Sequence, residues 1–372
     1  MGKRNTVISI CKAIGIILMV ITHSECPSAL SSFAHEFHMP LFFITAGYFF
    51  SLKYLSDEAT FVKKRVKGLY VPFLKWSVFF LIIHNWMFDL GILNEQYGNP
   101  SGGVTHPYSW HQIQQNLWTM VTAMAGYDQF LNGAFWFFRG LFVASILYLV
   151  LFKLYDAGAT RIGRPAWRTT VVPVAVCATA LALGAWKTGE GLRVINLVQG
   201  GYREIMGTFF FGCGFMFRQM HDRYRTAWWA TLALAAVTLA FSRLAPSSMA
   251  WNSDFEHFLR LPVPALCGFL MTYNISAWLD RHEGWLRRFL VYCGDNTLQI
   301  LVFHLVAFKV VSLVKIWWYG LDYLQIGCHT VIHEHSKDDC FWILYTVAGV
   351  GIPLACTYVF RKVRSHTRSL IK

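Results

Sequence analysis

Two basic side chains bracket one apolar stretch near the beginning of the chain. Lys12 and His23 enclose the apolar run Ile14 to Thr22, with ten residues between them. Eleven helical steps of about 100° and 1.5 Å each place both side chains on one face, about 16 Å apart along the axis. An imidazole with a near-neutral pKa can take a proton from a hydroxyl and return it to a leaving group. His23 is therefore our candidate catalytic residue, with Lys12 as a partner for a phosphate or a thioester carbonyl.

Both residues also have a structural explanation. A histidine at the end of an apolar helix can rest at a membrane interface, and a lysine one turn inside the boundary can extend its amine to water. An ionisable group inside a hydrophobic helix is nevertheless costly and usually has a function. The functional hypothesis for Lys12 and His23 requires both side chains to face the interior of a helix bundle.

Three further candidates lie in other apolar segments and are predicted to bind substrate. His38 opens a second apolar helix, with a proline two residues later, which suits a first helical turn. Arg139 lies about 12 Å inside the fourth apolar segment, so we expect it to face substrate or a buried acid. His304 lies at a similar depth from the other side, where it either shares a cavity with Arg139 or is a hydrogen-bonded structural residue.

The densest basic segment, Phe61 to Lys67, leads into the third apolar segment. Lys64, Arg65 and Lys67 could dock a cytoplasmic polyanion such as the phosphates of coenzyme A. Topogenic charge in contact with anionic lipid headgroups is the simpler explanation of the same pattern.

The composition is that of a membrane protein with several spans. Of 372 residues, 55% are hydrophobic, 17% are aromatic and only 14% are charged, unlike a soluble domain. The net charge of +13 would suggest nucleic acid in a soluble protein, but in a membrane protein it follows from the positive-inside rule. We therefore expect no nucleic-acid partner. The first apolar run is interpreted as a membrane span, because it carries Lys12 and lacks a signal-peptide cleavage site.

The hydrophobic pattern predicts an all-α integral membrane protein with about ten transmembrane helices. The ten spans are approximately 6-24, 38-53, 68-90, 131-153, 169-186, 203-219, 226-243, 260-279, 296-316 and 341-361. Basic residues concentrate at alternate connections, which predicts that both termini are cytoplasmic. Residues 91-130 and 319-340 are then extracytoplasmic loops. In the first of them, apolar residues at helical spacing predict an amphipathic helix along the outer interface, which could serve as a lid; they are Trp110, Ile113, Leu117, Met120 and Val121.

The cysteines and the loop histidines give weaker signals. None of the nine cysteines forms a CxxC pair, so we expect no zinc site. Cys328 and Cys340 flank the last outer loop and could form a disulfide or stay free thiols. The histidines at 329, 333 and 335 could bind a metal, but the sequence favours a solvated loop.

Several sequence motifs together resemble those of the membrane acyltransferase-3 superfamily. The first is the basic-x10-His pair of Lys12 and His23, followed by FHMPLFFITAGYFF at 37-50. The others are the basic segment that ends at Pro72, the N-G-x-x-W-F start of span four at 132-137, and a G-x-x-S-L-x-I-x-x-x-H phrase at 294-304. In the last phrase Thr297 stands where serine is frequent. The resemblance covers nearly the whole chain.

The resemblance implies a ten-helix membrane enzyme, with 1-372 as a single domain. Such enzymes move an acyl group, often acetyl from cytoplasmic acetyl-CoA, to a hydroxyl of a carbohydrate or glycolipid on the far side. It implies an essential role for His23, a partner role for Lys12 and acyl-CoA contacts by Arg65 and its neighbours. Arginine is common where Lys12 stands, and no family rule covers Arg139. We expect no metal, no fused outer domain and a multi-pass location in a bacterial cytoplasmic membrane.

Two other classes of function remain at this point. A transporter or exporter of a glycan or small molecule would also have about ten spans with buried charges. A structural scaffold would not explain the buried Arg139 and Lys309. The acyl length, the acceptor, a homodimer, and the choice between direct transfer and an acyl-histidine intermediate are left open.

Overall fold

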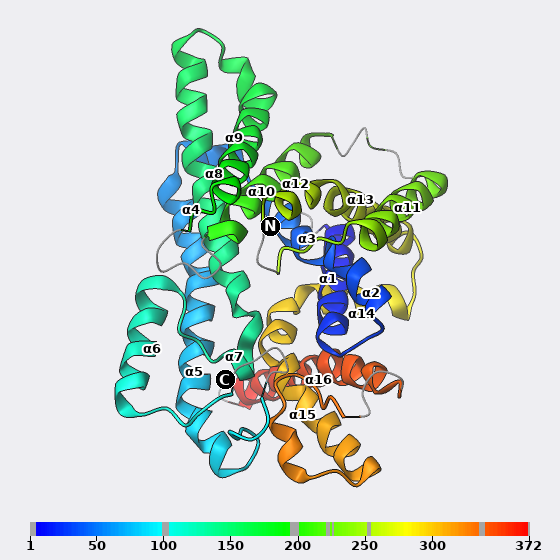
Figure 1. Cartoon of the computed structure of the whole chain (residues 1–372). Helices are drawn as coiled ribbons and strands as arrows, with labels where there is room; N and C mark the ends of the chain where they lie inside the picture. The colour runs from blue at the N-terminus through cyan, green and yellow to red at the C-terminus, as the bar shows by residue number, and fades with distance from the viewer. Residues whose placement is uncertain are drawn as a thin grey trace.

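The chain folds into packed helices (Figure 1). The computed structural model describes residues 5–98, 104–193, 201–220, 224, 227–250, 254–334 and 339–370, and these contain no strand. Within them, seven helical stretches are long and apolar enough to cross a membrane: Thr6–His23, Glu58–Asp89, Gln129–Arg161, Val171–Gly189, Phe255–Asp280, Thr297–Tyr319 and Phe341–Ser365. The prediction of an all-α membrane protein is confirmed.

Three further helices occupy the remaining predicted spans. They are α3 (His38–Tyr48), α10 (Tyr202–Met220) and α11 (Trp228–Leu244). The helix α3 is shorter than the predicted span 38-53, because it ends at Tyr48 and a 3-10 turn, η1 (Leu52–Leu55), follows. The helix α10 carries a buried arginine and a buried glutamate in its first turn, which lowers its apolar character. The number of ten spans and the cytoplasmic termini stay predictions.

The other elements follow in chain order. They are α1 (Thr6–His23), α2 (Ser28–His35), α4 (Glu58–Arg65), the π-helix η2 (Val66–Tyr70), α5 (Val71–Asp89), α6 (Trp110–Ala123), α7 (Gln129–Asn132), η3 (Gly133–Phe135), α8 (Trp136–Arg161), η4 (Pro165–Thr169), α9 (Val171–Gly189), α12 (Phe255–Arg260), α13 (Pro262–Asp280), α14 (Trp285–Asp295), α15 (Thr297–Tyr319), η6 (Tyr323–Gly327) and α16 (Phe341–Leu370).

The helix α1 is tied to other helices at both of its ends. The hydroxyl of Thr6, in its first turn, donates to Asp280 at the end of α13 over 2.8 Å. Ser24, directly after its last residue, shares a hydrogen bond of 3.3 Å with Thr346 in the second turn of α16. Each contact joins two ends that an alternating up-and-down path places on the same side, so the hydrogen bonds agree with the predicted alternation.

Two glycines let α3 and α10 pack backbone against backbone. A Cβ added at Gly47 would lie 1.8 Å from the carbonyl oxygen of Phe211, and one at Gly214 would lie 1.9 Å from that of Ile44. Small residues commonly allow such close approach between helices in membranes. The close packing fixes α3, and with it the histidine at its first position, against the centre of the bundle.

The amphipathic helix predicted in the first outer loop is α6, but its placement differs from the expectation. Asn85 lies near the end of α5, and its side chain forms two hydrogen bonds with the backbone of Tyr108, at 2.7 and 2.9 Å. The hydroxyl of Tyr70, before the start of α5, donates to the carbonyl of Val121 over 2.7 Å. The helix therefore runs antiparallel beside α5 (Figure 1) and not across the outer ends of the spans. Its buried residue is Met120.

Candidate active site

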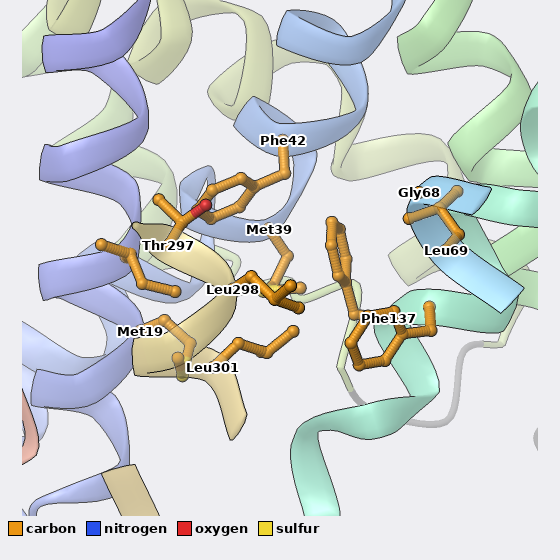
Figure 2. Close-up of a pocket in the computed structure, with 11 residues that line it drawn as sticks. Met19, Met39, Phe42, Gly68, Leu69, Phe137, Thr297, Leu298 and Leu301 are labelled. Carbon is orange, nitrogen blue, oxygen red and sulfur yellow. The ribbon is translucent and has the colours of Figure 1, made fainter. Parts of the chain in front are cut away.

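Five elements enclose a cavity of about 160 Å³ beside α1 (Figure 2). Its walls come from α1, α3, η2, α8 and α15, and the lining residues are Ile16, Met19, Met39, Phe42, Gly68, Leu69, Phe137, Phe138, Thr297, Leu298 and Leu301. Apart from the hydroxyl of Thr297, the lining side chains are apolar. Binding pockets are typically apolar with a few polar groups, so this cavity suits an acyl group or a hydrocarbon arm.

The predicted face of α1 points toward this cavity. Ile16 and Met19, each 2% exposed, line it and lie on the helical stripe that runs from Lys12 to His23. Both Lys12 and His23 are half-buried, and one uninterrupted helix carries them. The two basic residues therefore lie at opposite ends of a stripe whose middle lines the cavity. Their role in catalysis stays a prediction.

The ring of His304 packs against the ring of His23. The two rings are perpendicular, with centroids 5.2 Å apart. His304 is fully buried, and its Nδ1 donates to the carbonyl oxygens of Ile300 and Leu301, each at 3.0 Å. Leu301 also lines the cavity. His304 is therefore a hydrogen-bonded histidine, as one of the two alternatives predicted, and its ring packs against His23. The cavity lining includes neither His304 nor Arg139, so it does not show the shared cavity of the other alternative.

His38 is buried, next to a residue that lines the cavity. Its exposed fraction is 2%, its Nδ1 donates to the carbonyl of Ala34 over 2.7 Å, and the next residue, Met39, lines the cavity. The ring of His35 packs against it with centroids 5.2 Å apart. His38 is the first residue of α3, as predicted, and its ring is covered by the surrounding side chains.

The sequence interpretation missed His35 as part of this group. Its Nδ1 donates to the carbonyl of Ser31 over 2.8 Å. Burial lowers the pKa of His35 below its ordinary value of 6.5. His35, His38 and His329 are all close enough to interact electrostatically with His23. The signal in the sequence was the helical spacing of three residues between His35 and His38.

The short elements α7 and η3, directly before α8, border His329 of the same group. A Cβ at Gly133 would lie 3.6 Å from Nε2 of His329. The side-chain amide of Asn132 is buried, and neither its nitrogen nor its oxygen has a hydrogen-bond partner among the described residues. A buried amide without partners is costly in a folded protein, so it is available to a polar ligand.

Two of the predicted acyl-CoA contacts are engaged with aromatic residues. Lys64 is exposed, and its amine donates to the hydroxyl of Tyr54 over 3.0 Å. Arg65 is half-buried, with its guanidinium 4.8 Å from the ring centroid of Phe61 and 5.3 Å from that of Phe211. Such cation–π contacts stabilise the position of a guanidinium. Arg65 is therefore partly committed to packing, whereas Lys64 reaches solvent.

Lys67 lies directly beside the cavity wall. It is exposed, and the next two residues, Gly68 and Leu69, line the cavity from the side opposite to α15 (Figure 2). All three belong to the π-helix Val66–Tyr70. Single π-helical turns occur mostly inside longer helices and often at functional sites. The basic segment thus leads from solvent to the cavity.

Arg139 forms an ion pair with a buried acid and does not line the cavity. Its Nε donates to Oε1 of Glu204 on α10 over 2.9 Å, and the two side chains are 3% and 4% exposed. Of the two partners expected for Arg139, substrate or a buried acid, the structure places the acid beside it. The sequence interpretation missed Glu204, although an acidic residue inside the predicted span 203-219 is itself a signal.

Lys309 also has a structural role. Its amine donates to the carbonyl oxygens of Ile326 and Cys328 at 2.7 and 2.6 Å. Further along α15, Lys315 forms an ion pair with Asp339 at 2.8 Å. These lysines attach the last loop to α15. We had expected the buried Lys309 to argue against a structural protein, but this structural role removes that argument.

The loop histidines and cysteines form no metal site in the described part of the chain. His329 donates from Nε2 to the carbonyl of Gln129 over 2.8 Å, and His333 pairs with Glu25. His335 lies outside the described residues. Cys328 and Cys340 are both free thiols.

The fold and the cavity define a membrane-helical protein with an apolar pocket along α1 and a pair of packed histidines at the end of that helix. The chain matches the family model Acyl_transf_3, described as acyltransferase domain, over residues 5–362. It therefore belongs to this acyltransferase family. Comparisons with curated proteins and with solved structures found no match.

Proposed function

We propose that this acyltransferase moves an acetyl group from cytoplasmic acetyl-CoA to a hydroxyl of a carbohydrate or glycolipid at the outer side of a bacterial cytoplasmic membrane. The observation that carries the proposal is the apolar cavity along the stripe from Lys12 to His23. One end of this stripe lies on the side of the basic segment, and the other end is the histidine pair. A cavity with this arrangement suits a donor and an acceptor that arrive from opposite sides.

The donor enters from the side of the basic segment. Lys64 and Lys67 are exposed there and can bind the phosphates of coenzyme A. The pantetheine arm passes Gly68 and Leu69 into the apolar cavity, where Lys12 contacts a phosphate or the thioester carbonyl. The distance of about 16 Å between Lys12 and His23 is within the reach of that arm.

The transfer needs one proton acceptor. A ring nitrogen of His23 takes the proton of the acceptor hydroxyl while the hydroxyl oxygen bonds to the thioester carbonyl carbon. The carbon–sulfur bond then breaks, and His23 returns the proton to the leaving sulfur. The products are the acetyl ester and the free thiol of coenzyme A, so no further reactant is required.

The acceptor approaches His23 from the far side of the cavity. His38 borders this approach, and the unpartnered amide of Asn132 can both donate to and accept from sugar hydroxyls. Arg139 is held by Glu204, so its contribution is to fix α8 against α10 behind the cavity wall at Phe138.

The alternative is a transporter or exporter. Such a protein needs polar groups along a continuous path, whereas Arg139 is paired with an acid and Lys309 with backbone carbonyls. Purified protein in detergent separates the two classes. Hydrolysis of acetyl-CoA, or transfer of its acetyl group to a soluble sugar, supports the enzyme; flux of substrate in liposomes without loss of acetyl-CoA supports transport.

The direct test is His23→Ala in cells, with mass spectrometry of surface glycans. We expect O-acetylation to disappear while the amount of protein in the membrane stays normal. His282→Ala, an exposed histidine on the connection after α13, is the matched control and should leave O-acetylation unchanged. Retained O-acetylation in His23→Ala would remove His23 from the mechanism.

A further inference from the structure

His304 has one ring nitrogen whose purpose the fold does not explain. Its Nδ1 faces two carbonyl oxygens, which can only accept hydrogen bonds, so Nδ1 carries the proton. In the neutral ring, Nε2 is then an acceptor. This Nε2 is buried and has no hydrogen-bond partner among the described residues. An unpaired buried acceptor costs about 1–3 kcal/mol, so a partner is expected within reach.

His23 is in the position to be that partner. Two imidazoles joined by one N–H···N hydrogen bond of about 3 Å have centroids a little over 5 Å apart, because each nitrogen lies about 1 Å from its own ring centre. The measured centroid separation of 5.2 Å fits this geometry. The ring of His23 is half-buried, and at this separation a hydrogen bond requires only that one of its nitrogens face Nε2 of His304.

We propose that His304 is a positioning residue for His23 and forms a histidine dyad with it. Nε2 of His304 accepts a hydrogen bond from one ring N–H of His23. The other ring nitrogen of His23 then carries no proton and faces the cavity, as proton abstraction from the acceptor hydroxyl requires. The inference rests on the proposed function, because it assigns the orientation of the base in that same reaction.

In this dyad His23 faces the substrate and His304 acts behind it. Its Nε2 is covered, whereas the ring of His23 is half-buried at the end of the cavity stripe. During transfer, His23 holds the hydroxyl proton on its cavity-facing nitrogen, and the hydrogen bond to His304 stabilises the imidazolium. The proton then leaves to the sulfur of coenzyme A, and both histidines return to their starting states.

The test compares two replacements of His304 in the purified full-length enzyme. His304→Gln keeps an acceptor oxygen at similar reach, and His304→Leu keeps the bulk without an acceptor. Acetyl transfer to a soluble sugar is measured with acetyl-CoA varied. We expect kcat of His304→Leu to fall by about 100-fold, the range of one acid–base contribution, with KM for acetyl-CoA within about twofold of wild type. His304→Gln should recover at least about tenfold of that loss.

The control is His84→Gln on α5. His84 is also a fully buried histidine, but its two nitrogens are bonded to Asp128 and to the carbonyl of His106, away from the cavity. Its replacement should lower thermal stability and leave kcat per folded molecule near wild type. If His304→Leu does not accumulate, His304→Met replaces it in the comparison.

Equal activity of the Gln and apolar variants, at either high or low level, would overturn the dyad. A failure of the dyad alone is distinguishable from a failure of the proposed function. In the first case His23→Ala is inactive and the two His304 variants have equal activity, whether high or low, whereas in the second case His23→Ala itself keeps transferring acetyl groups.

Discussion

The proposed chemistry uses few side chains. His23 and His304 come from helices that are far apart in the chain, and Lys12 lies on the same stripe as His23. The spacing of Lys12 and His23 could be interpreted from the sequence, because both lie on one helix. The contact with His304 could not, because helical periodicity carries no information about which helix packs against which face.

Arg139 and Glu204 give a stability prediction at this scale. Removing one member of a buried ion pair leaves the other charge unpaired, at a cost of about 3–5 kcal/mol, whereas replacing both can be nearly neutral. We expect Arg139→Met and Glu204→Gln each to lower the thermal unfolding temperature in detergent, and the double replacement to recover most of the loss. A double variant as unstable as the sum of the single variants would contradict the pairing.

The depth of Arg139 was predictable from the sequence, and its partner was not. Counting residues from the start of the apolar segment indicated that the guanidinium could not reach water. The acid that pairs with it is on α10, 65 residues later. A buried arginine can be neutralised by an anionic substrate or by a buried acid. The sequence alone does not distinguish these two partners, since both satisfy the same charge.

Among the elements, the π-helix η2 makes the most specific prediction about the donor route. A Cβ at Gly68 meets no atom within 4 Å, so Gly68→Ala should be tolerated. Gly68→Phe adds a ring beside the cavity and should lower kcat/KM for acetyl-CoA about tenfold or more. Both variants should accumulate and unfold like wild type. Full activity of Gly68→Phe would place the donor route elsewhere.

The short helix α2 makes stability depend on pH through His35. Burial lowers the pKa of His35 below its ordinary 6.5, so in the range below 6.5 the unfolded chain binds a proton that the folded chain excludes. Stability should therefore fall as pH decreases from about 7 toward 5. His35→Gln should make this decrease shallower in thermal unfolding. Burial lowers the pKa of His329 as well, so part of the dependence should remain; an unchanged slope in His35→Gln would contradict this account.

Element types were more predictable than element placement. The alternation of apolar segments indicated helices at all ten predicted spans, and the amphipathic pattern indicated α6. The side of α5 on which α6 lies depends on hydrogen bonds from Asn85 and Tyr70. Those contacts join residues that are 23 and 51 positions apart, and no local pattern records them.

For the whole molecule, the account requires that donor and acceptor sit on opposite sides of one membrane. The contacts of Thr6 with Asp280 and of Ser24 with Thr346 agree with an alternating path, and the basic segment lies toward one end of it. The direction of that path follows from the distribution of Lys and Arg. Transfer therefore depends on which side of the membrane each end of this path faces.

Radiolabelled acetyl-CoA added to sealed membrane vesicles tests this claim most directly. Vesicles from cells that make the protein are prepared in inverted and in right-side-out form, with His23→Ala vesicles as the control. We predict labelled glycan only in inverted wild-type vesicles, with the label protected from an external esterase until detergent is added. Labelling in right-side-out vesicles, or label that the esterase removes from intact inverted vesicles, would contradict transfer across the membrane.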